Sequence, residues 1–398
     1  MHKLVENNWG QEEHDAIQAV IISGQFTMGP MVHKFEEEFA SFLGRRHAIM
    51  VNSGSSANLL AVASLFYRRY KPLRRGDEAI VPAVAWSTTY SPLHQYGLKL
   101  RVVDVDIDTL NIDVRQLERA LTPETRLIVA VNILGNPAAL DTVQDFAKEK
   151  GLYFLEDNCE SMGAKLNGKQ AGTFGDIGTF SMFFSHQLST AEGGFVTTDD
   201  DECAALVKCL RAHGWDRDLS PVENCYFPVR ESNMMPDDYH FLLPGYNVRP
   251  LEISAAVGLV QFKKLREMIS WRRWNMMYFQ NVFKRDDRFI TQRENGTSSS
   301  FCFPIVLNPK YYPISDTVSY RAHVLNALAE EGIEARMITG GNLLNHPVVH
   351  YYDYAIPQRV FSADLVHNAG FFVGNHPRPL VNAIHHLYMV LDRVCRHG

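Results

Sequence analysis

His186 stands in a segment, residues 179–187, whose hydroxyl groups and aromatic rings surround a side chain that can do proton chemistry. Imidazole has an ordinary pKa near about 6.5, so it can accept or release a proton close to neutral pH. It has no primary amine and, unlike lysine, cannot form a covalent imine with an aldehyde. We therefore predict that His186 is a general base or acid and not a covalent anchor.

Two further segments offer groups that bind an anion or a charged ring. The run Ser53-Gly54-Ser55-Ser56 stands between an expected strand and an expected helix. Its hydroxyls, its free backbone N–H groups and the positive end of the helix can together bind phosphate. The same residues also make ordinary helix caps, and both interpretations stay open. Asp157 closes an apolar run, where its carboxylate either holds a protonated ring nitrogen or caps a helix.

These groups need a sheet that brings them to one edge. Short apolar runs recur along the first half of the chain, at 48–51, 79–81, 100–105, 127–131, 152–155, 178–184 and 194–197. Helical patterns separate several of them, which predicts an α/β fold with a mainly parallel sheet covered on both faces. Ligands of such sheets bind at the carboxyl ends of the strands, so the chemistry is expected in the loops after these runs.

A second unit is predicted after a loop-rich region at 214–250. A long helical pattern at 251–283 leads into a strand at 301–307 and a helix at 319–331. Two more helices are expected at 11–43, before the first strand. We therefore expect a large domain at 1–250, which includes the N-terminal helices, and a smaller C-terminal α/β domain at 251–398.

Composition narrows the class of protein. The 398 residues carry a net charge of −6 and are 46% hydrophobic, which indicates a globular enzyme and argues against nucleic acid or membrane as a partner. The six cysteines form no C-x-x-C pair and no cluster with histidine, so reduced, mostly buried thiols and no metal site are expected. Neither a signal-like start nor a run of about 18 apolar residues occurs, which predicts a cytoplasmic protein.

The segment 179–194 resembles the cofactor segment of the sugar-nucleotide aminotransferases, the DegT/DnrJ/EryC1/StrS family, in which a lysine stands at the place of His186. The further segments that fit this family are 53–58, 82–89, 156–163 and 245–250. Together the resemblance covers nearly the whole chain. It implies an aspartate-aminotransferase fold of type I, whose large domain has a mainly parallel seven-stranded sheet. It also implies pyridoxal 5′-phosphate and pyridoxamine 5′-phosphate as the two forms of the cofactor.

The residues that the resemblance assigns to cofactor binding are Gly54, Ser55, Trp86, Asp157, Glu160, Ser181 and Asn247. It implies that Asp157 holds the pyridine nitrogen and that Trp86 stacks on the face of the ring. The cofactor phosphate would be bound by Gly54, Ser55 and Ser181. These roles are consistent with the phosphate-binding and carboxylate interpretations given above for the same segments.

Two of these positions carry further implications. Asn247 would reach the phosphate from a second subunit, which implies a homodimer with shared active sites. Glu160 stands where the family usually has a glutamine near the cofactor's phenolic oxygen. One related branch holds an iron–sulfur cluster on a cysteine-rich loop. The corresponding region here has Cys203, Cys209 and Cys225 without a C-x-C pair, so no cluster is expected.

A histidine in place of the lysine is similar to the branch that removes the C3 hydroxyl of nucleotide-linked 4-keto-6-deoxy sugars. The implied activity is that of a lyase, a 3-dehydratase with glutamate as amino donor, the GDP-mannose derivative as the expected substrate and His186 as base. A sugar-nucleotide aminotransferase, a non-catalytic sugar-nucleotide sensor and an engineered lysine-to-histidine exchange stay open as alternatives. Loops at 214–250 and 336–350 are expected to select the nucleotide and the sugar.

Overall fold

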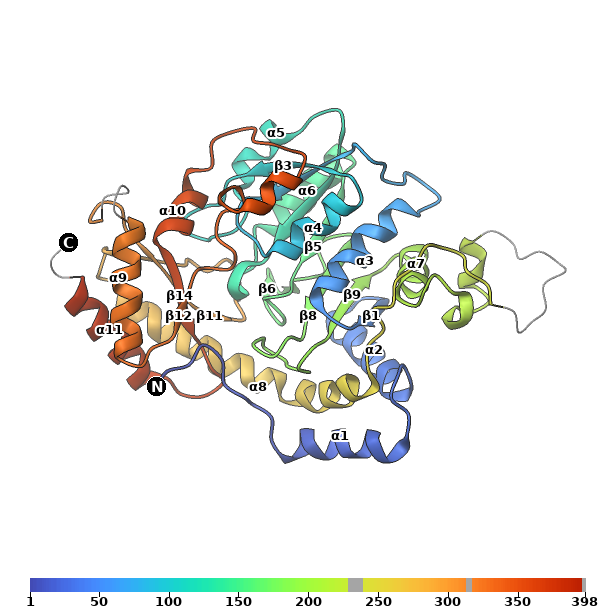
Figure 1. The fold of residues 1–398 in the computed structure, drawn as a ribbon, viewed down its shortest axis with the longest axis horizontal. Coiled ribbons are helices and arrows are strands. Elements are labelled where there is room, and N and C mark those ends of the chain that lie inside the picture. The colour runs from blue at the N-terminus through green and yellow to red at the C-terminus, as the bar shows by residue number, and fades with distance from the viewer. Residues whose placement is uncertain (228–238, 313–316, 396–398) are drawn as a thin grey trace.

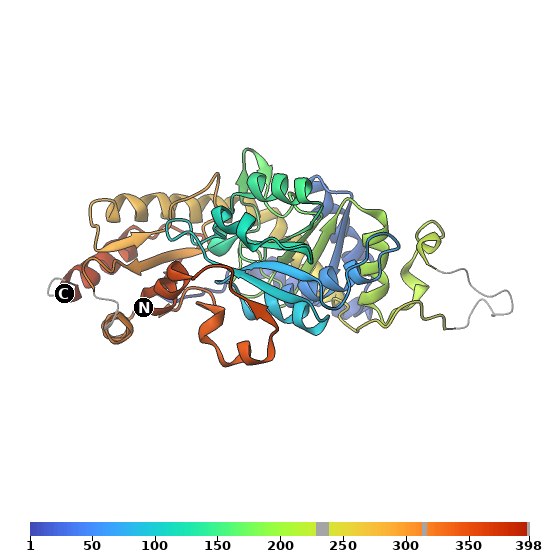
Figure 2. The same cartoon turned by 90° about the horizontal axis from the view of Figure 1, so that it is seen from above.

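The computed structural model describes residues 1–227, 239–312 and 317–395. Figure 1 shows a central sheet with helices around it, and a second, smaller sheet with its own helices at the end of the molecule where the N-terminus lies. Figure 2, seen from above, places most of the orange and red C-terminal elements at that same end, whereas one orange-red segment reaches back to the middle of the molecule. The long helix α8 (Glu252–Phe283) runs from this end along the central sheet.

The large sheet has eight strands in the order β1-β9-β8-β5-β4-β2-β3-β13. They are β1 (His47–Val51), β2 (Glu78–Pro82), β3 (Lys99–Val103), β4 (Thr125–Val131), β5 (Tyr153–Asp157), β8 (Ile177–Ser181), β9 (Gly194–Thr198) and β13 (Tyr354–Ala355). β9 is antiparallel to both of its neighbours, and the remaining neighbours pair in parallel. Seven strands come from residues 47–198, as the family resemblance implied, and the short β13 adds an eighth at the edge.

Helices cover both faces of this sheet. They are α2 (Pro30–Leu43), α3 (Gly54–Phe66), α4 (Ser87–Gln95), α5 (Leu117–Ala120), α6 (Leu140–Lys150) and α7 (Asp201–Arg211). Alternate residues of a strand point to opposite faces. Ala79 and Val81 of β2 belong to the core that includes α3 and α4, whereas Ile80 belongs to the core that includes α5 and α6. The uninterrupted apolar runs in the sequence follow from this two-sided burial.

One strand is shorter than its sequence predicts. The apolar run at 178–184 predicts a strand to residue 184, but β8 ends at Ser181. The chain then turns, and the backbone N–H of Thr190 donates to the carbonyl of Met182 at 2.9 Å. This turn carries His186 and holds it at the carboxyl edge of the sheet.

The smaller sheet has four antiparallel strands in the order β10-β11-β14-β12. Its strands and adjoining helices are β10 (Phe289–Thr291), β11 (Cys302–Leu307), β12 (Ala335–Arg336), β14 (Gly370–Gly374), α9 (Thr317–Glu330), α10 (Phe361–Ala369) and α11 (Val381–Val394). Helices α1 (Gln11–Ser23), α2 and α11 all pack against α8. Because α8 contacts elements of both parts, the domain boundary expected at residue 250 stays a prediction.

The remaining elements are a small hairpin of β6 (Lys165–Leu166) and β7 (Lys169–Gln170), and short 3₁₀ helices at Val114–Gln116, Ile133–Gly135, Asp216–Asp218, Glu223–Tyr226, Leu343–Asn345 and Pro347–Tyr351. Within the described ranges, no helix is both long and apolar enough to cross a membrane. All six cysteines are free thiols, and four of them are buried, as expected: Cys203, Cys209, Cys302 and Cys395.

Candidate active site

A cavity of about 650 Å³ opens at the carboxyl ends of β5 and β8, beside the first turn of α3. The residues named from the sequence that line it are Gly54, Ser55, Trp86, Asp157, Glu160, Ser181 and His186. The C-terminal part of the chain adds Phe301, Arg336, Met337, Thr339 and Phe372. The cavity therefore lies at the sheet edge where the alternating pattern predicts ligand binding.

The turn before α3 is built to bring backbone N–H groups close to β8. Ser53 caps the helix, because its Oγ accepts the backbone N–H of Ser56 at 3.1 Å. A Cβ built on Gly54 would lie 2.6 Å from the Cβ of Ser181, so this close approach requires glycine. The helix-cap interpretation of the Ser-Gly run is therefore confirmed, and because the same turn lines the cavity, phosphate binding stays a prediction that its position supports.

Asp157 ends β5 as a buried carboxylate with no positive partner among the described residues. Its Oδ2 accepts from Asn58 Nδ2 at 2.9 Å and from Thr89 Oγ1 at 2.8 Å, and its Oδ1 accepts the backbone N–H of Cys159 at 3.2 Å. Neutral donors orient the carboxylate and leave its charge uncompensated. This arrangement suits a protonated ring nitrogen, and no helix of the described chain begins here, so Asp157 is not a helix cap.

His186 lies between two aromatic rings in the turn after β8. Its ring centroid is 5.3 Å from that of Phe301 and 5.9 Å from that of Phe183. Its Nδ1 is 3.4 Å from Ser185 Oγ, and its Nε2 has no hydrogen-bond partner in the described part of the chain. Burial, and next the positive charge of Arg272, lower the pKa of His186 to about 4. The imidazole is therefore neutral near neutral pH, the form that can take up a proton.

Arg272, in the middle of α8, is a buried guanidinium with no carboxylate partner in the described ranges. Its Nη1 donates to the carbonyl of Phe301 at 3.0 Å and to that of Asn375. Asn375 Nδ2 in turn donates to the carbonyls of Arg272 at 2.8 Å and Ser300 at 2.9 Å. Burial lowers the pKa of Arg272 to about 10. Arg272 thus fixes the segment whose phenyl ring packs on the histidine, and adds positive charge nearby.

Glu160, at the position where the family resemblance implies a glutamine, lines the same cavity. Its Oε2 accepts the backbone N–H of Leu134 at 2.8 Å, and its backbone carbonyl accepts from Gln187 Nε2 at 2.6 Å. Burial raises the pKa of Glu160 to about 7, and the negative charge of Asp157 acts in the same direction. A protonated Glu160 can donate a hydrogen bond as a glutamine amide does, so the exchange keeps this capability below about pH 7.

Asn247 is the predicted cofactor residue that does not line the cavity of its own chain. Its side chain is exposed, and its Oδ1 accepts from Arg249 Nε at 3.0 Å. A role toward a second subunit stays a prediction. Of the loop region at 214–250 that we expect to select the nucleotide, residues 228–238 lie outside the described residues.

The C-terminal part contributes a wall of the cavity, and three of its residues, Arg336, Met337 and Thr339, fall in the loop 336–350 that we expect to select the substrate, whereas Phe301 and Phe372 were not predicted. β12 pairs with β14 so that Arg336 stands opposite Phe372, and the ring of Phe372 lies 6.4 Å from that of Phe301. No local pattern marks Phe301 and Phe372 as site residues, because only the packing of distant strands brings them to the cavity. Thr89 and Asn58 could have been singled out, since they belong to segments that carry the family resemblance.

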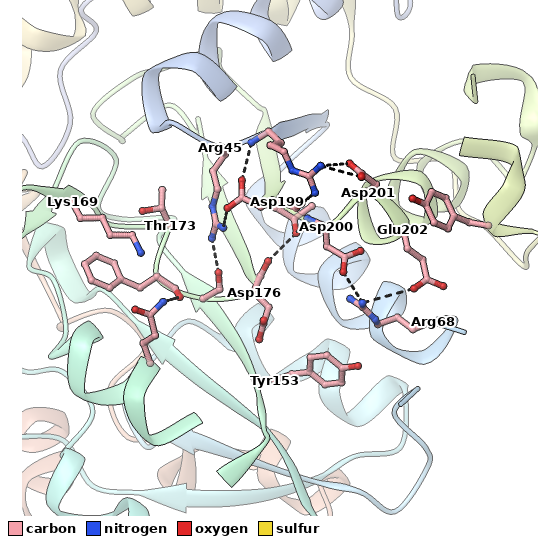
Figure 3. Close-up of a pocket in the computed structure, with 16 residues that line it drawn as sticks. Arg45, Arg68, Tyr153, Lys169, Thr173, Asp176, Asp199, Asp200, Asp201 and Glu202 are labelled. Carbon is pink, nitrogen blue, oxygen red and sulfur yellow. Dashed lines mark hydrogen bonds and ion pairs between the residues drawn. The ribbon is translucent and has the colours of Figure 1, made fainter. Parts of the chain in front are cut away.

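A second cavity, of about 710 Å³, lies at the amino-terminal ends of β5 and β8, on the opposite edge of the sheet. Figure 3 shows its charged side chains turned toward one another, with Arg45 beside Asp199 and Arg68 beside Asp200. None of the predicted site residues lines it. In the ranges that the structure describes, no cluster of three or more histidine, cysteine or acidic side chains could hold a metal ion.

Comparison with known proteins gives close matches. The chain matches the model of the DegT/DnrJ/EryC1/StrS aminotransferase family over residues 7–379. It is 46% identical to GDP-4-keto-6-deoxy-D-mannose 3-dehydratase of Yersinia pseudotuberculosis, over 98% of each chain. The structure of the E. coli GDP-4-keto-6-deoxy-D-mannose-3-dehydratase with bound hydrated PLP has a TM-score of 0.93 at 45% identity, and covers 98% of this chain and 99% of that chain. A structure of GDP-4-keto-6-deoxymannose-3-dehydratase with a trapped PLP-glutamate geminal diamine also has a TM-score of 0.93 at 45% identity, covering 98% and 100%. These similarities confirm the predicted fold.

Proposed function

Because the chain belongs to the DegT/DnrJ/EryC1/StrS aminotransferase family, we propose that it is a pyridoxal-phosphate-dependent lyase, a 3-dehydratase of GDP-4-keto-6-deoxy-D-mannose. Glutamate is the amino donor, and its oxidation to 2-oxoglutarate and ammonia supplies the two electrons that replace the C3 hydroxyl by hydrogen. One observation carries the proposal. His186 stands in a cavity to which the described residues contribute no lysine.

The cavity fits pyridoxal phosphate. The backbone and hydroxyl donors at Gly54, Ser55 and Ser181 would hold its phosphate, at the close approach that requires glycine. Asp157, whose negative charge has no positive partner among the described residues, would hold the ring nitrogen, and the exposed indole of Trp86 would cover the ring. When bound, the cofactor supplies an electron-withdrawing ring that stabilises negative charge on the neighbouring carbon.

His186 moves the proton in this proposal. Its Nε2, free of other partners in the described part of the chain, takes the proton from the carbon at the reacting centre as a general base. Burial keeps the imidazole neutral and ready to accept that proton, because it lowers the pKa of His186 to about 4. The packing of Phe301 and Phe183 on the ring holds its orientation. Since imidazole forms no covalent imine, non-covalent contacts alone retain the cofactor.

The same proposal includes a homodimer with shared active sites, in which Asn247 reaches the cofactor phosphate bound by the other subunit. Its support is that Asn247 is exposed and lies outside its own cavity, while the other predicted phosphate-binding residues line it. The division into domains at 1–250 and 251–398 and a cytoplasmic location belong to the proposal as well. Six free cysteines are compatible with a reducing compartment.

The exchange His186→Asn tests the proposal, with GDP-4-keto-6-deoxy-D-mannose, glutamate and saturating pyridoxal phosphate. We expect dehydration to fall by roughly two to four powers of ten, because the proton-transfer group is lost. Cofactor binding should persist, because Asp157 and the turn before α3 are intact. His14→Asn, on the exposed surface of α1, is the matched control and should keep the parent rate.

The outcomes separate the alternatives that the sequence left open. An aminotransferase would give an amino sugar in place of the 3-deoxy product. A sensor would show no turnover before or after the exchange. Dehydration by the asparagine variant at the parent rate would show that His186 is not the base, and the mechanism above would then be wrong.

A further inference from the structure

Positive charge is scarce in the active-site cavity. Among the described residues that line it, Arg336 is the one with a permanent positive charge, whereas Asp157, Glu160 and Glu192 carry carboxyl groups. Carboxylates repel anions, so the lining as a whole is unfavourable for a negatively charged ligand. Within the lining that one chain supplies, Arg336 is therefore the permanent positive charge available to an anionic group that binds away from the first turn of α3.

The substrates of the proposed function are anionic. A nucleoside diphosphate sugar carries two phosphate charges, and an amino-acid donor such as glutamate carries two carboxylates. The cofactor phosphate would have its own donors around Gly54 and Ser181. These residues come from the first half of the chain, whereas Arg336 comes from its C-terminal part. The substrates still need a donor for their charge, because an unpaired anion in a partly enclosed site is costly.

Arg336 is placed to supply that donor. It ends β12 and stands opposite Phe372 of β14, whose ring lies 6.4 Å from that of Phe301. Phe301 in turn packs on His186 at 5.3 Å, so the arginine belongs to the same wall as the proposed base. Its side chain is exposed and forms no hydrogen bond or ion pair within the described ranges.

The other arginines near either cavity are already engaged. Arg272 is buried and donates to two backbone carbonyls. In the second cavity, Arg45 and Arg68 pair with carboxylates at 2.6 Å, as Figure 3 shows. A guanidinium offers five N–H donors in a planar fork that matches a carboxylate or a phosphate. In Arg336 this fork is free of partners from the described residues.

We propose that Arg336 binds the anionic group of a substrate in this cavity, either a carboxylate of the amino donor or a phosphate of the sugar nucleotide. The identity of these ligands rests on the proposed function. The choice of Arg336 rests on the charge and geometry of the cavity. Both ligands share the chemistry that the guanidinium recognises, an anion with two adjacent oxygen acceptors.

The test uses Arg336→Gln and Arg336→Lys in the cofactor-loaded full chain. Arg359→Gln is the matched control, because Arg359 is also exposed and without an ion pair in the described chain, packs on Phe361, and lies outside the cavity. Calorimetry with GDP measures phosphate binding without any turnover. Absorbance of the cofactor, titrated with glutamate in the absence of sugar, measures donor binding. Thermal unfolding confirms that each variant is folded.

We expect the glutamine variant to bind one of the two ligands about 10- to 100-fold more weakly than the parent, because a hydrogen bond to a charged group is lost. Lysine should restore part of that affinity. Weaker GDP binding identifies the phosphate as the partner, and weaker glutamate binding identifies the carboxylate.

Parent-like affinity of the glutamine variant for both ligands would overturn the inference. A different result would contradict the proposed function alone: the parent protein would bind GDP or glutamate through Arg336 but would form no 3-deoxy product. A parent that binds neither ligand would overturn both.

Discussion

Two cavities open at opposite edges of the large sheet, and they differ in whether their charged side chains form ion pairs. At the amino-terminal edge, Arg45 pairs with Asp199 and Arg68 with Asp200, each at 2.6 Å (Figure 3). At the carboxyl-terminal edge, Asp157 meets only neutral donors in the described chain. The first of these, the paired cavity, measures about 710 Å³ and the other about 650 Å³, so the two are similar in size and volume does not distinguish them.

We interpret the ion-paired side chains of the paired cavity as groups that stabilise the fold, and the unpaired charged side chains of the other cavity as groups that can bind a ligand. An ion pair near the protein surface contributes about 0 to 1 kcal/mol to the free energy of unfolding. A buried ionisable group without an opposite charge lowers stability, and proteins retain such groups mainly where function requires them. Asp157, Glu160 and Arg272 are of this second kind, and all of them belong to the carboxyl-terminal cavity or its wall.

Removing the uncompensated carboxylate should have the largest effect. Asp157→Asn replaces a charge by a neutral amide of the same size, which cannot stabilise a protonated ring nitrogen. We expect kcat to fall by roughly 100- to 1,000-fold and cofactor binding to weaken. The matched exchange in the other cavity, Asp200→Asn, should leave kcat unchanged. A parent-like kcat for Asp157→Asn would break the distinction between the two cavities.

Glu160→Gln should change stability in a pH-dependent way. The pKa of Glu160 is raised to about 7 from its ordinary 4.5, so between these values the folded chain holds a proton that the unfolded chain releases. Stability therefore falls as pH rises through this window and stays reduced above it. Glutamine removes the penalty, and we expect the variant to be more stable than the parent by about 1 to 3 kcal/mol above pH 7, with no gain below pH 4.5.

Unfolding at pH 4, 6 and 8 measures this effect. Glu202→Gln, in the paired cavity, is the control of opposite sign, because it removes a partner of Arg69 and should destabilise the fold at neutral pH. Equal behaviour of the two glutamine variants at pH 8 would contradict the comparison.

Replacing Arg272 should shift the pH dependence of kcat/KM more than it lowers the maximal rate. Its positive charge lowers the pKa of His186, so removing that charge in Arg272→Met should raise the pKa. The acid limb of kcat/KM should then move to higher pH, by up to about one unit, since the base works in its neutral form. Arg272→Lys keeps the charge and should keep the limb in place. A limb that moves equally in both variants would mean that packing, and not charge, is responsible.

The smallest effect is expected in the paired cavity. Arg68→Met breaks the ion pair with Asp200, whose carboxylate is partly exposed, and should lower the free energy of unfolding by about 1 kcal/mol or less. Turnover should be unchanged, because the change lies at the edge of the sheet away from His186. Denaturant unfolding and kcat are the two measurements. A tenfold loss of kcat with full stability would show that this cavity takes part in function.

Much of the architecture could be predicted because its signals are local. The helical pattern at 251–283 matches α8 to within one residue, and each of the seven apolar runs contains or overlaps a strand of the large sheet. The run at 178–184 is the instructive error: its apolar residues continue, but the chain turns after Ser181 to place the histidine. Apolar residues fit a buried turn as well as a strand, so periodicity alone could not find this end.

The candidate site was predicted to the extent that its residues follow strands or carry family motifs. Gly54 begins a helix that follows a strand, Asp157 and Ser181 end strands, and His186 stands in the turn after a strand, and the carboxyl ends of parallel strands share one edge. Arg272 and Phe301 could not be found in this way, and Arg336 was indicated only as part of the loop 336–350 that we expect to select the substrate. They come from a long helix and from a second sheet, and reach the site only because distant elements pack together.

The sequence by itself determined the fold and the family, and it singled out His186 as the proposed proton-transfer group, because each rests on residue types at short spacing along the chain. The tertiary structure decided which charged groups have partners and which do not. Charge compensation depends on distances of a few ångströms between segments that are far apart in sequence, as between Arg68 and Asp200 at 2.6 Å. It also set the protonation of His186, since burial and the charge of Arg272 lower its pKa, and neither is visible in the residues beside it.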